Sequence, residues 1–229
     1  MDEETGSLVT VDDLARQVAS AANRIGSGRR YLLGIAGPPA AGKSTVATRL
    51  AAALNRRDAG LAGMAPMDGF HRTTRELTAA GELERKGQPH TFDVPGFVAR
   101  LRALRNPAAG IEVGWPVYDR EIHDPVPDGV VFRRQRIVVL EGNYLLLDEP
   151  GWRDARSLLD ECWYLDAGAE SIERRLYERH RAGGKTPEVA RAQIAHNDLP
   201  NATLVSGTRA RADVVLTPRG EKYLVRSTR

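Results

Sequence analysis

Apolar and polar positions along the chain follow two alternating periods, one typical of strands and one typical of helices. Five short apolar segments predict buried strands: YLLGIAG (31–37), GLAGMAPM (60–67), the start of RIVVLEGNYLLL (136–147), CWYLDA (162–167) and, as the last clear one, ADVVLTP (212–218). Helical periodicity separates these segments. Strands that alternate with helices predict a doubly wound, mainly parallel sheet flanked by helices, which is an α/β fold.

Helix start signals support this pattern. Thr10 followed by Asp13 resembles a capping box, and it precedes one apolar face made of Leu14, Val18, Ala21 and Ile25. Three further helices are predicted at KSTVATRLAAALNRR (43–57), PGFVARLRALR (95–105) and AESIERRLYERHRAG (169–183). Thr186-Pro187 is an N-cap followed by a proline at the first helical position, so it opens another helix.

Composition shows no break that would divide the chain, so residues 1–229 are predicted to form a single domain. Residues 1–29 hold the N-terminal helix. Residues 69–96 have poor periodicity and are rich in Gly, Pro, His and charge, which predicts a long functional loop or inserted flap. Residues 170–200 are predicted to form a helical lid, with Gly183 and Gly184 as the break between two helices.

Bulk properties exclude some classes of protein. The net charge of +3 and pI near 9.2 do not by themselves indicate nucleic-acid binding, and anionic small ligands are an equally good interpretation. No apolar run approaches the ~18 residues that span a membrane, and MDEETGSLVT (1–10) lacks the features of a signal peptide. The single cysteine, Cys162, excludes an internal disulfide and is predicted to be a core residue. A cytoplasmic protein is therefore expected.

The segment GPPAAGKST (37–45) matches the phosphate-loop pattern, with a predicted strand before it and a predicted helix after it. Glycines allow the backbone N–H groups to converge on phosphate oxygens, and the helix start adds its own N–H groups. Pro38 and Pro39 have no N–H, so the donors come mainly from the later half of the loop. The expected ATP-binding residues here are Gly37, Ala40, Ala41, Gly42, Lys43, Ser44 and Thr45.

Within this loop, Lys43 is expected to reach the terminal phosphates and to take part in catalysis, and Ser44 is expected to place its hydroxyl on Mg²⁺. The chain contains no Asn-Lys pair, so it lacks the guanine-reading motif of GTPases. DEPG (148–151) fits the loose D-x-x-G pattern and is predicted to be an ordinary turn.

Two acids follow predicted strands. Asp68 lies just after the second strand, and Glu141 ends the apolar run VVLE of the third segment. Ligands of doubly wound sheets bind at the carboxyl ends of the strands, so both acids are expected beside the phosphate loop. Glu141 is a candidate Mg²⁺ ligand, and Asp68 is a candidate base for an attacking hydroxyl. The alternative for each acid is that it only caps a turn.

The predicted helix 169–183 carries Arg174, Arg175, Arg179 and Arg181. A solvated face with a Glu170–Arg174 pair, worth only ~0.3–0.5 kcal/mol, accounts for some of these arginines. Phosphoryl transfer needs fixed positive charge over the transferring group, and an arginine on a closing lid supplies it. Arg175 and Arg179 are the candidates for that role.

The ordered set GPPAAGKST, MDGFH, RKGQPHTFD, YDREIHDPVPD, LEGNYLLL and RHRAGG with NDLPNATLV resembles the phosphoribulokinase, uridine kinase and bacterial pantothenate kinase superfamily over residues 31–216. It is most similar to small bacterial kinases described as nucleoside kinase-like or fructose-transport-associated. The resemblance implies a P-loop NTPase domain that binds ATP with Mg²⁺ and phosphorylates a hydroxyl of a small metabolite. It also implies that Asp68 is the base and that Glu141 helps to hold Mg²⁺.

Acceptor recognition is expected from polar residues in the flap and the later loops. Sequence chemistry suggests His71, Arg72, His90, Asp93, Tyr118, Arg120 and His123, with Tyr118 and Arg120 foremost. The resemblance of RKGQP to a pantothenate kinase segment places Arg85 and Lys86 beside the acceptor. HTFD and PVYDREIHDP depart from the pantothenate kinase pattern, which argues against pantothenate as the acceptor.

Two further predictions concern the C-terminal part. Asn197 and Asn201 match a family segment near the lid and nucleotide, and Asn197 is taken as a substrate-binding residue; the alternative is that they end a helix ahead of Pro200. SGTRARAD (206–213) is expected to help wrap the adenine, with Arg209 as its contact.

These features predict an ATP-dependent kinase whose acceptor is a sugar, polyol or related metabolite. A nucleoside or pantothenate-like kinase is the alternative within the enzyme class, and the aromatic content of 6% weakly disfavours a stacked nucleobase. Two alternatives come from other classes of protein. A nucleotide-gated regulatory module would give the segment MDGFHR no role. A nucleic-acid-binding ATPase would bind its nucleic acid with a steep dependence on salt concentration. We expect neither nucleic-acid nor membrane partners; a homodimer is common in the family.

Overall fold

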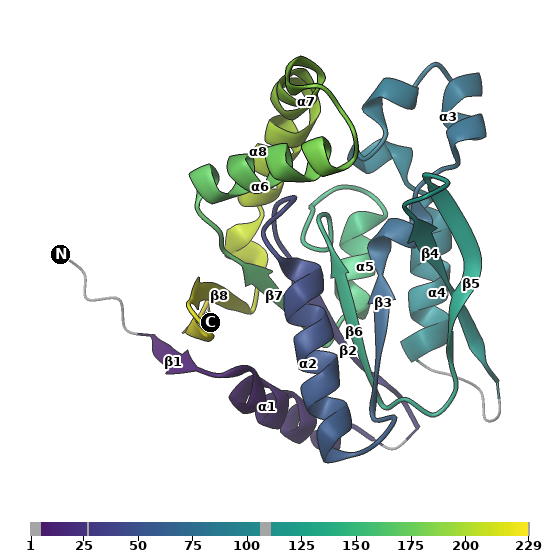
Figure 1. The fold of residues 1–229 in the computed structure, drawn as a ribbon. Coiled ribbons are helices and arrows are strands. Elements are labelled where there is room, and N and C mark those ends of the chain that lie inside the picture. The colour runs from purple at the N-terminus through teal and green to yellow at the C-terminus, as the bar shows by residue number, and fades with distance from the viewer. Residues whose placement is uncertain (1–5, 27, 106–110, 229) are drawn as a thin grey trace.

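The computed structural model describes residues 6–26, 28–105 and 111–228. Its centre is a seven-stranded sheet in the order β1-β9-β8-β7-β2-β6-β3 (Figure 1). Strands β3, β6, β2, β7 and β8 pair in parallel, and β9 pairs antiparallel with both β8 and β1. The strands are β1 (Ser7–Val9), β2 (Tyr31–Ala36), β3 (Ala62–Pro66), β6 (Ile137–Gly142), β7 (Glu161–Leu165), β8 (Val214–Arg219) and β9 (Lys222–Ser227). The predicted α/β fold is confirmed.

Helices cover both faces of the sheet. Helices α1 (Val11–Arg24) and α2 (Lys43–Arg57) pack on one face, where Leu33 and Ile35 of β2 point. Helices α4 (Val94–Arg105) and α5 (Trp152–Leu158) pack on the other, which receives Leu32 and Ala36. Because both faces of β2 are buried, all six of its residues are buried, and its sequence is a continuous apolar run rather than an alternating one.

Three strand features differ from the sequence expectation. The chain does not end its strands at ADVVLTP, because β9 follows it and pairs with β1, a three-residue strand that carries too short a pattern to be recognised. A separate antiparallel hairpin, β4 (Val113–Asp119) and β5 (Asp124–Phe132), was also missed. Its prolines 116, 125 and 127 obscure the strand pattern. A two-stranded ribbon tolerates them because each strand has an unpaired edge.

The segment 69–96 is built of short helical pieces rather than unstructured loop. A 3-10 turn, Met67–Phe70, comes directly after β3 and is followed by α3 (Thr74–Ala79). Two further 3-10 turns span Leu83–Arg85 and Pro89–Thr91. We call residues 71–93 the flap; it projects beside the tip of the β4–β5 hairpin (Figure 1).

A helical lid is present where the sequence predicts it. It contains α6 (Ala169–Ala182), α7 (Pro187–Gln193), a π-helical segment Ile194–Asp198 and α8 (Leu199–Ser206). The break at Gly183–Gly184 and the Thr186 N-cap are both present. The chain does not leave the helix ahead of Pro200: Leu199 N–H donates to Ile194 O, and the π segment carries the chain straight into α8.

Other expectations concern single sites. The capping box at Thr10 and Asp13 is present, and Cys162 is completely buried. DEPG lies in a turn ahead of α5. Among the described residues, no helix has the length and apolarity that crossing a membrane requires.

Candidate active site

A polar cavity of about 430 Å³ lies at the carboxyl ends of β2, β3 and β6. The phosphate loop, the 3-10 turn after β3, the flap, the hairpin tip and the lid all contribute to its walls. The lining side chains discussed below are Lys43, Ser44, Asp68, His71, Lys86, Arg120, Glu141, Asn143, Arg175, Arg179, His180, Asn197, Asp198 and Asn201. The sheet edge therefore brings together segments from the whole length of the chain, as expected for a doubly wound fold.

The phosphate loop connects β2 to α2. Gly42 is the N-cap of α2 with φ +101°, a conformation that L residues rarely adopt. Ala40 also has a positive φ, +60°. Pro39, Ala40, Gly42, Ser44 and Thr45 line the cavity. The free N–H groups and the positive dipole end at the start of α2 make this an anion-binding site.

The Lys43 side chain is buried beneath the loop. Its ammonium donates to Pro38 O at 2.9 Å and to the side-chain oxygen of Asn143 at 2.6 Å. Burial lowers the pKa of Lys43, while the carboxylates of Glu141 and Asp68 act in the opposite direction. The amine therefore lies within electrostatic reach of both acids.

Asp68 and Glu141 lie together because β3 and β6 are neighbours. Pro66 pairs with Glu141 in the parallel register, and Asp68 comes two residues after Pro66. Burial, and then the nearby charge of Asp68, raises the pKa of Glu141; Lys43 and a hydrogen bond from Ser44 lower it. Two carboxylates thus share one cavity with one buried ammonium.

A close contact fixes the turn that holds Asp68. A Cβ on Gly69 would lie 2.0 Å from the carbonyl oxygen of Pro116 in β4, so only glycine fits beneath the hairpin. The indole N–H of Trp115 donates to Pro66 O at 2.9 Å from the same strand. The hairpin therefore rests directly on the backbone that carries Asp68.

The residues at the loop fit the oxygen chemistry of Mg²⁺. This ion keeps several waters and takes one or two carboxylates together with substrate phosphate oxygens. Glu141 is a buried carboxylate hydrogen-bonded by the Ser44 hydroxyl at the start of α2. No group of three or more His, Cys, Asp or Glu side chains suited to a metal occurs among the described residues, and a Mg²⁺–phosphate site does not require one.

The two lid arginines predicted for catalysis both line the cavity. Arg175 donates to the carbonyls of Ala40 and Ala41 at 3.3 Å, so its guanidinium rests on the phosphate loop. Arg179 lies 3.4 Å from Asp198, and its charge lowers the pKa of Lys43. Arg179 is therefore the lid arginine whose charge is felt at the buried amine.

Three aromatic rings pack together on the acceptor side, and two of them, His71 and Phe92, line the cavity. The His71 ring lies between Phe92, at 4.0 Å between centroids, and Tyr118, at 4.9 Å. Burial lowers the pKa of His71, although the neighbouring charge of Asp68 raises it. His71 Nδ1 is 2.7 Å from Asp68 O, so this ring is tied to the turn that carries the acid.

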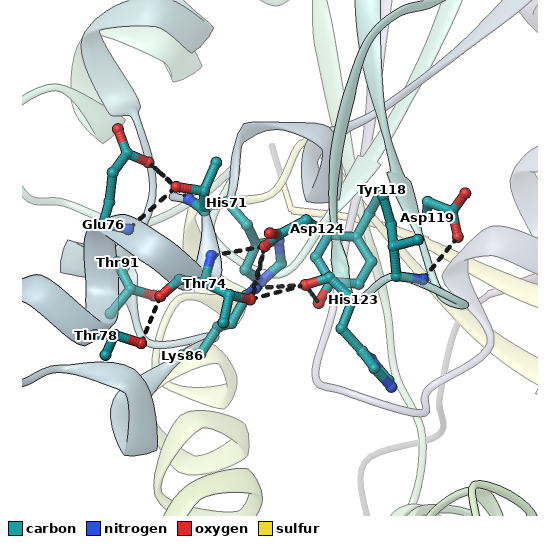
Figure 2. A network of polar contacts seen from close by, with 12 residues as sticks. His71, Thr74, Glu76, Thr78, Lys86, Thr91, Tyr118, Asp119, His123 and Asp124 are labelled. Atoms are coloured by element: carbon teal, nitrogen blue, oxygen red, sulfur yellow. Dashed lines mark hydrogen bonds and ion pairs between the residues drawn. The ribbon is translucent and has the colours of Figure 1, made fainter.

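Lys86 joins the flap to the hairpin (Figure 2). Its ammonium donates to Thr74 Oγ1 at 3.0 Å, His123 O at 2.6 Å and Asp124 Oδ1 at 2.9 Å. A lysine ammonium has three N–H donors, so all three are engaged within the protein. The structure thus gives Lys86 a joining role, and Lys86 also lines the cavity in which the family resemblance places the acceptor.

Asn197 makes contacts between the lid and the flap. Its amide donates to Lys86 O at 3.3 Å, and its oxygen accepts from Gln88 and Asn201 at 3.4 Å. Tyr144 adds a third tie to the flap, since its hydroxyl donates to Gly87 O at 2.6 Å. The turn at residues 86–88 is therefore held from three sides.

Several predicted residues lie away from the cavity. Arg85 and His90 are exposed and both pair with Glu82. Arg209 pairs with Asp166 at 3.1 Å and does not line the cavity. Gly37, Ala41 and Tyr118 lie behind the residues that line it, and Arg72 and Asp93 border a second cavity beyond the hairpin. His123 takes part through its backbone carbonyl.

The sequence reasoning missed Asn143, His180 and Asp198. Asn143 binds the Lys43 amine and stands two residues after Glu141 in LEGNY, so its position was a usable signal. His180 and Asp198 form a buried pair at 2.7 Å. Asp198 contacts His180 from the π-helical segment, and no local sequence pattern predicts that segment.

The strand-loop-helix phosphate site, the paired acids and the arginine lid define a P-loop kinase. Residues 32–224 match the phosphoribulokinase / uridine kinase family, and the chain belongs to that family. It is an ATP-dependent phosphotransferase. This membership removes the regulatory module without an acceptor from consideration.

Named relatives differ in the acceptor that their names state. A Schizosaccharomyces pombe protein provisionally named uridine kinase is 36% identical over 196 residues, 82% of this chain and 83% of that protein. A Streptomyces coelicolor pantothenate kinase is 38% identical over 166 residues, 68% of this chain and 49% of that enzyme. A crystal structure from Silicibacter sp. TM1040, provisionally named a fructose transport system kinase, is 36% identical with a TM-score of 0.82, covering 92% of this chain and 99% of that one.

Proposed function

We propose that this kinase transfers the γ-phosphoryl group of ATP to a hydroxyl of a small polar metabolite, such as a sugar or polyol, with Asp68 as the base. The observation that carries the proposal is that Asp68 shares a polar cavity with the phosphate loop and acts electrostatically on Lys43. A carboxylate that lines the same cavity as the phosphate loop can take the proton of a hydroxyl held between it and phosphates bound at the loop.

The mechanism follows from the arrangement of these groups. The loop amides and Lys43 hold the phosphates, with Asn143 and Pro38 fixing the amine. Asp68 accepts the hydroxyl proton as the acceptor oxygen bonds to the γ-phosphorus and the bond to the β-phosphate oxygen breaks, releasing ADP. Arg179 moves from Asp198 to balance charge on the transferring group.

Ser44 and Glu141 are the residues that would hold Mg²⁺ on this reading. The ion, when bound, would neutralise charge on the phosphates. Glu141 is suited to this because it is a buried carboxyl group that accepts a hydrogen bond from the Ser44 hydroxyl at the start of α2.

The test is Asp68→Asn, with turnover and ATP binding measured separately. General-base removal lowers kcat by about 10²- to 10⁴-fold, while the ATP dissociation constant stays near that of the unmodified protein. Asp58→Asn is the matched control because Asp58 is an exposed C-cap residue of α2, outside the cavity. ADP formation is followed with a pooled panel of sugars, polyols, nucleosides and pantothenate. Near-normal turnover in Asp68→Asn would refute the assignment of the base.

A nucleoside acceptor is the second candidate. The rings of His71 and Phe92, which line the cavity, favour it, because aromatic side chains stack on nucleobases. The uridine kinase name of one relative agrees with it. Uridine, tested by itself, distinguishes the two candidate acceptors. ADP formation that depends on uridine, and not on sugars or polyols, supports a nucleoside acceptor.

A further inference from the structure

The positive charges that line the cavity are already partnered, with one exception. Lys43 is held by Pro38 O and Asn143, and Lys86 by Asp124. Arg175 rests on the phosphate loop and Arg179 lies beside Asp198. Within the described part of the chain, Arg120 lines the same cavity without a hydrogen bond or ion pair. Its guanidinium is thus available to a ligand.

Arg120 is an exposed residue of the hairpin tip that also lines the cavity. Its charge lowers the pKa of His71, whose ring lies on the turn that holds Asp68. It also lowers the pKa of Glu141 at the end of β6. Arg120 lines the same cavity as Asp68 and acts electrostatically on groups next to it, so it is placed to contact an acceptor bound beside Asp68.

The hairpin tip that carries Arg120 is held by several hydrogen bonds. Asp119 Oδ1 accepts the backbone N–H of Glu121 at 2.7 Å, which closes a tight turn. Tyr118 OH and the Lys86 ammonium both donate to His123 O, at 2.7 and 2.6 Å (Figure 2). The two ends of residues 119–123 are therefore tied to each other and to the flap. Such preorganisation lowers the cost of binding a ligand.

We propose that the acceptor bears a carboxylate or phosphate besides its reactive hydroxyl, and that Arg120 binds this anionic group. The inference rests on the proposed function and names its substrate class. A guanidinium presents paired N–H donors that match carboxylate and phosphate oxygens. Asp68 and Glu141 are carboxylates that line the same cavity, so an anionic group on the acceptor is favoured beside Arg120 rather than beside these two acids. An anionic acceptor is thus oriented with its charge toward Arg120 and its hydroxyl toward Asp68.

The experiment compares acceptors in matched pairs that differ only in the anionic group. D-gluconate with sorbitol and glycerate with glycerol test a carboxylate; fructose 6-phosphate with fructose tests a phosphate. Acceptor-dependent ADP formation is measured for the unmodified protein, Arg120→Gln, Arg120→Lys and Glu121→Gln. Glu121 is an exposed neighbour on the same tip and lies outside the cavity, so Glu121→Gln controls for a general change of charge.

We expect anionic members of at least one pair to be preferred. Arg120→Gln then raises the acceptor KM about 10- to 100-fold, the usual effect of losing charged hydrogen bonds. Arg120→Lys raises the acceptor KM less than Arg120→Gln does, and the KM for ATP stays unchanged in both variants. Equal use of both members of every pair, or an effect of Arg120→Gln on ATP alone, would overturn this proposal and leave the kinase standing. ATP binding without acceptor-dependent ADP from any compound in these pairs or in the pooled panel would count against both proposals.

Discussion

The phosphate-binding side of the cavity comes from one stretch of chain, whereas the acceptor side comes from several. Residues 37–45 run from β2 into α2, and short-range geometry such as the positive φ of Gly42 shapes them. The acceptor side combines the flap, the hairpin tip and the lid, which contact one another through Lys86 and Asn197. One side is thus determined locally and the other by contacts distant in sequence.

This difference has consequences for function. Nucleotide binding depends on a conformation that the loop sequence itself encodes, so it tolerates changes elsewhere. Acceptor binding depends on how the flap, the hairpin tip and the lid are held together, so single contacts between them matter. Variants that remove such contacts should impair acceptor use before they impair ATP binding.

The largest effect is expected at the lid, where the two sides meet. Arg179→Ala should lower kcat by about 10³-fold or more, the range of an arginine that stabilises phosphoryl transfer, with little change in ATP affinity. Its charge reaches Lys43, and its tie to Asp198 at 3.4 Å is weak enough to exchange for phosphate. Steady-state kinetics with a working acceptor measures this.

Two variants on the same helix sharpen the result. Arg175→Ala should cost less in kcat because its guanidinium already binds phosphate-loop carbonyls. Arg174→Ala is the control, since Arg174 borders an outer groove away from the cavity. A loss at Arg175 that matches or exceeds the loss at Arg179 would reverse this assignment.

An intermediate effect is expected where the flap meets the hairpin. Asp124→Asn should lower the free energy of unfolding by about 1–2 kcal/mol, less than a fully buried charged hydrogen bond because the side chain is 27% exposed. Urea denaturation measures the change. Acceptor KM should rise, while ATP affinity stays constant. A rise in the KM for ATP instead would contradict the separation between the phosphate-binding side and the acceptor side of the cavity.

The same residue gives a pH dependence. The Lys86 hydrogen bond lowers the pKa of Asp124 to about 2, from 3.8 in the unfolded chain. A lowered pKa in the folded state means that the stabilisation is complete above pH ~4 and is lost as pH falls toward 2. The difference between unmodified protein and Asp124→Asn should therefore be constant from pH 5 to 7 and shrink below pH 4. A difference that grows on acidification would contradict it.

The smallest effects compare two capping boxes of the same chemistry. Thr10 caps α1 on the sheet, and Thr73 caps α3 in the flap. Thr10→Ala should lower the global free energy of unfolding by about 1 kcal/mol. Thr73→Ala should act mainly on local opening of the flap, because α3 has only six residues. Hydrogen exchange separates the two, and an equal global loss would show that flap and sheet unfold together.

The sequence predicts the sheet well because its central strands are buried on both faces. All five predicted strands of the central sheet are present, as are the helices that start at Lys43 and Pro187. The β4–β5 hairpin was not predicted because its prolines obscure the alternating pattern. Strands β1 and β9 were not predicted because they are short or exposed. Hydrophobic patterns indicate burial, so they do not identify a strand that is not buried.

The site follows the same division. The phosphate loop, Asp68 and Glu141 were predicted to lie together because each lies at the carboxyl end of a predicted strand. Lys86 was predicted to lie beside the acceptor and lines the cavity, but its three hydrogen-bond partners lie up to 38 positions away in sequence. The pair formed by His180 and Asp198 depends on a π-helical segment. No periodicity encodes contacts of that kind.

The contact between Gly69 and Pro116 has a further consequence for how enzymes of this shape diversify. Because the β4 backbone presses on the residue next to the acid, the strands of the hairpin cannot drift without disturbing Asp68. The tip, residues 119–123, is free of that constraint. Exchange of those few residues is thus the cheapest route by which evolution, or a designer, could give the same catalytic machinery a different substrate.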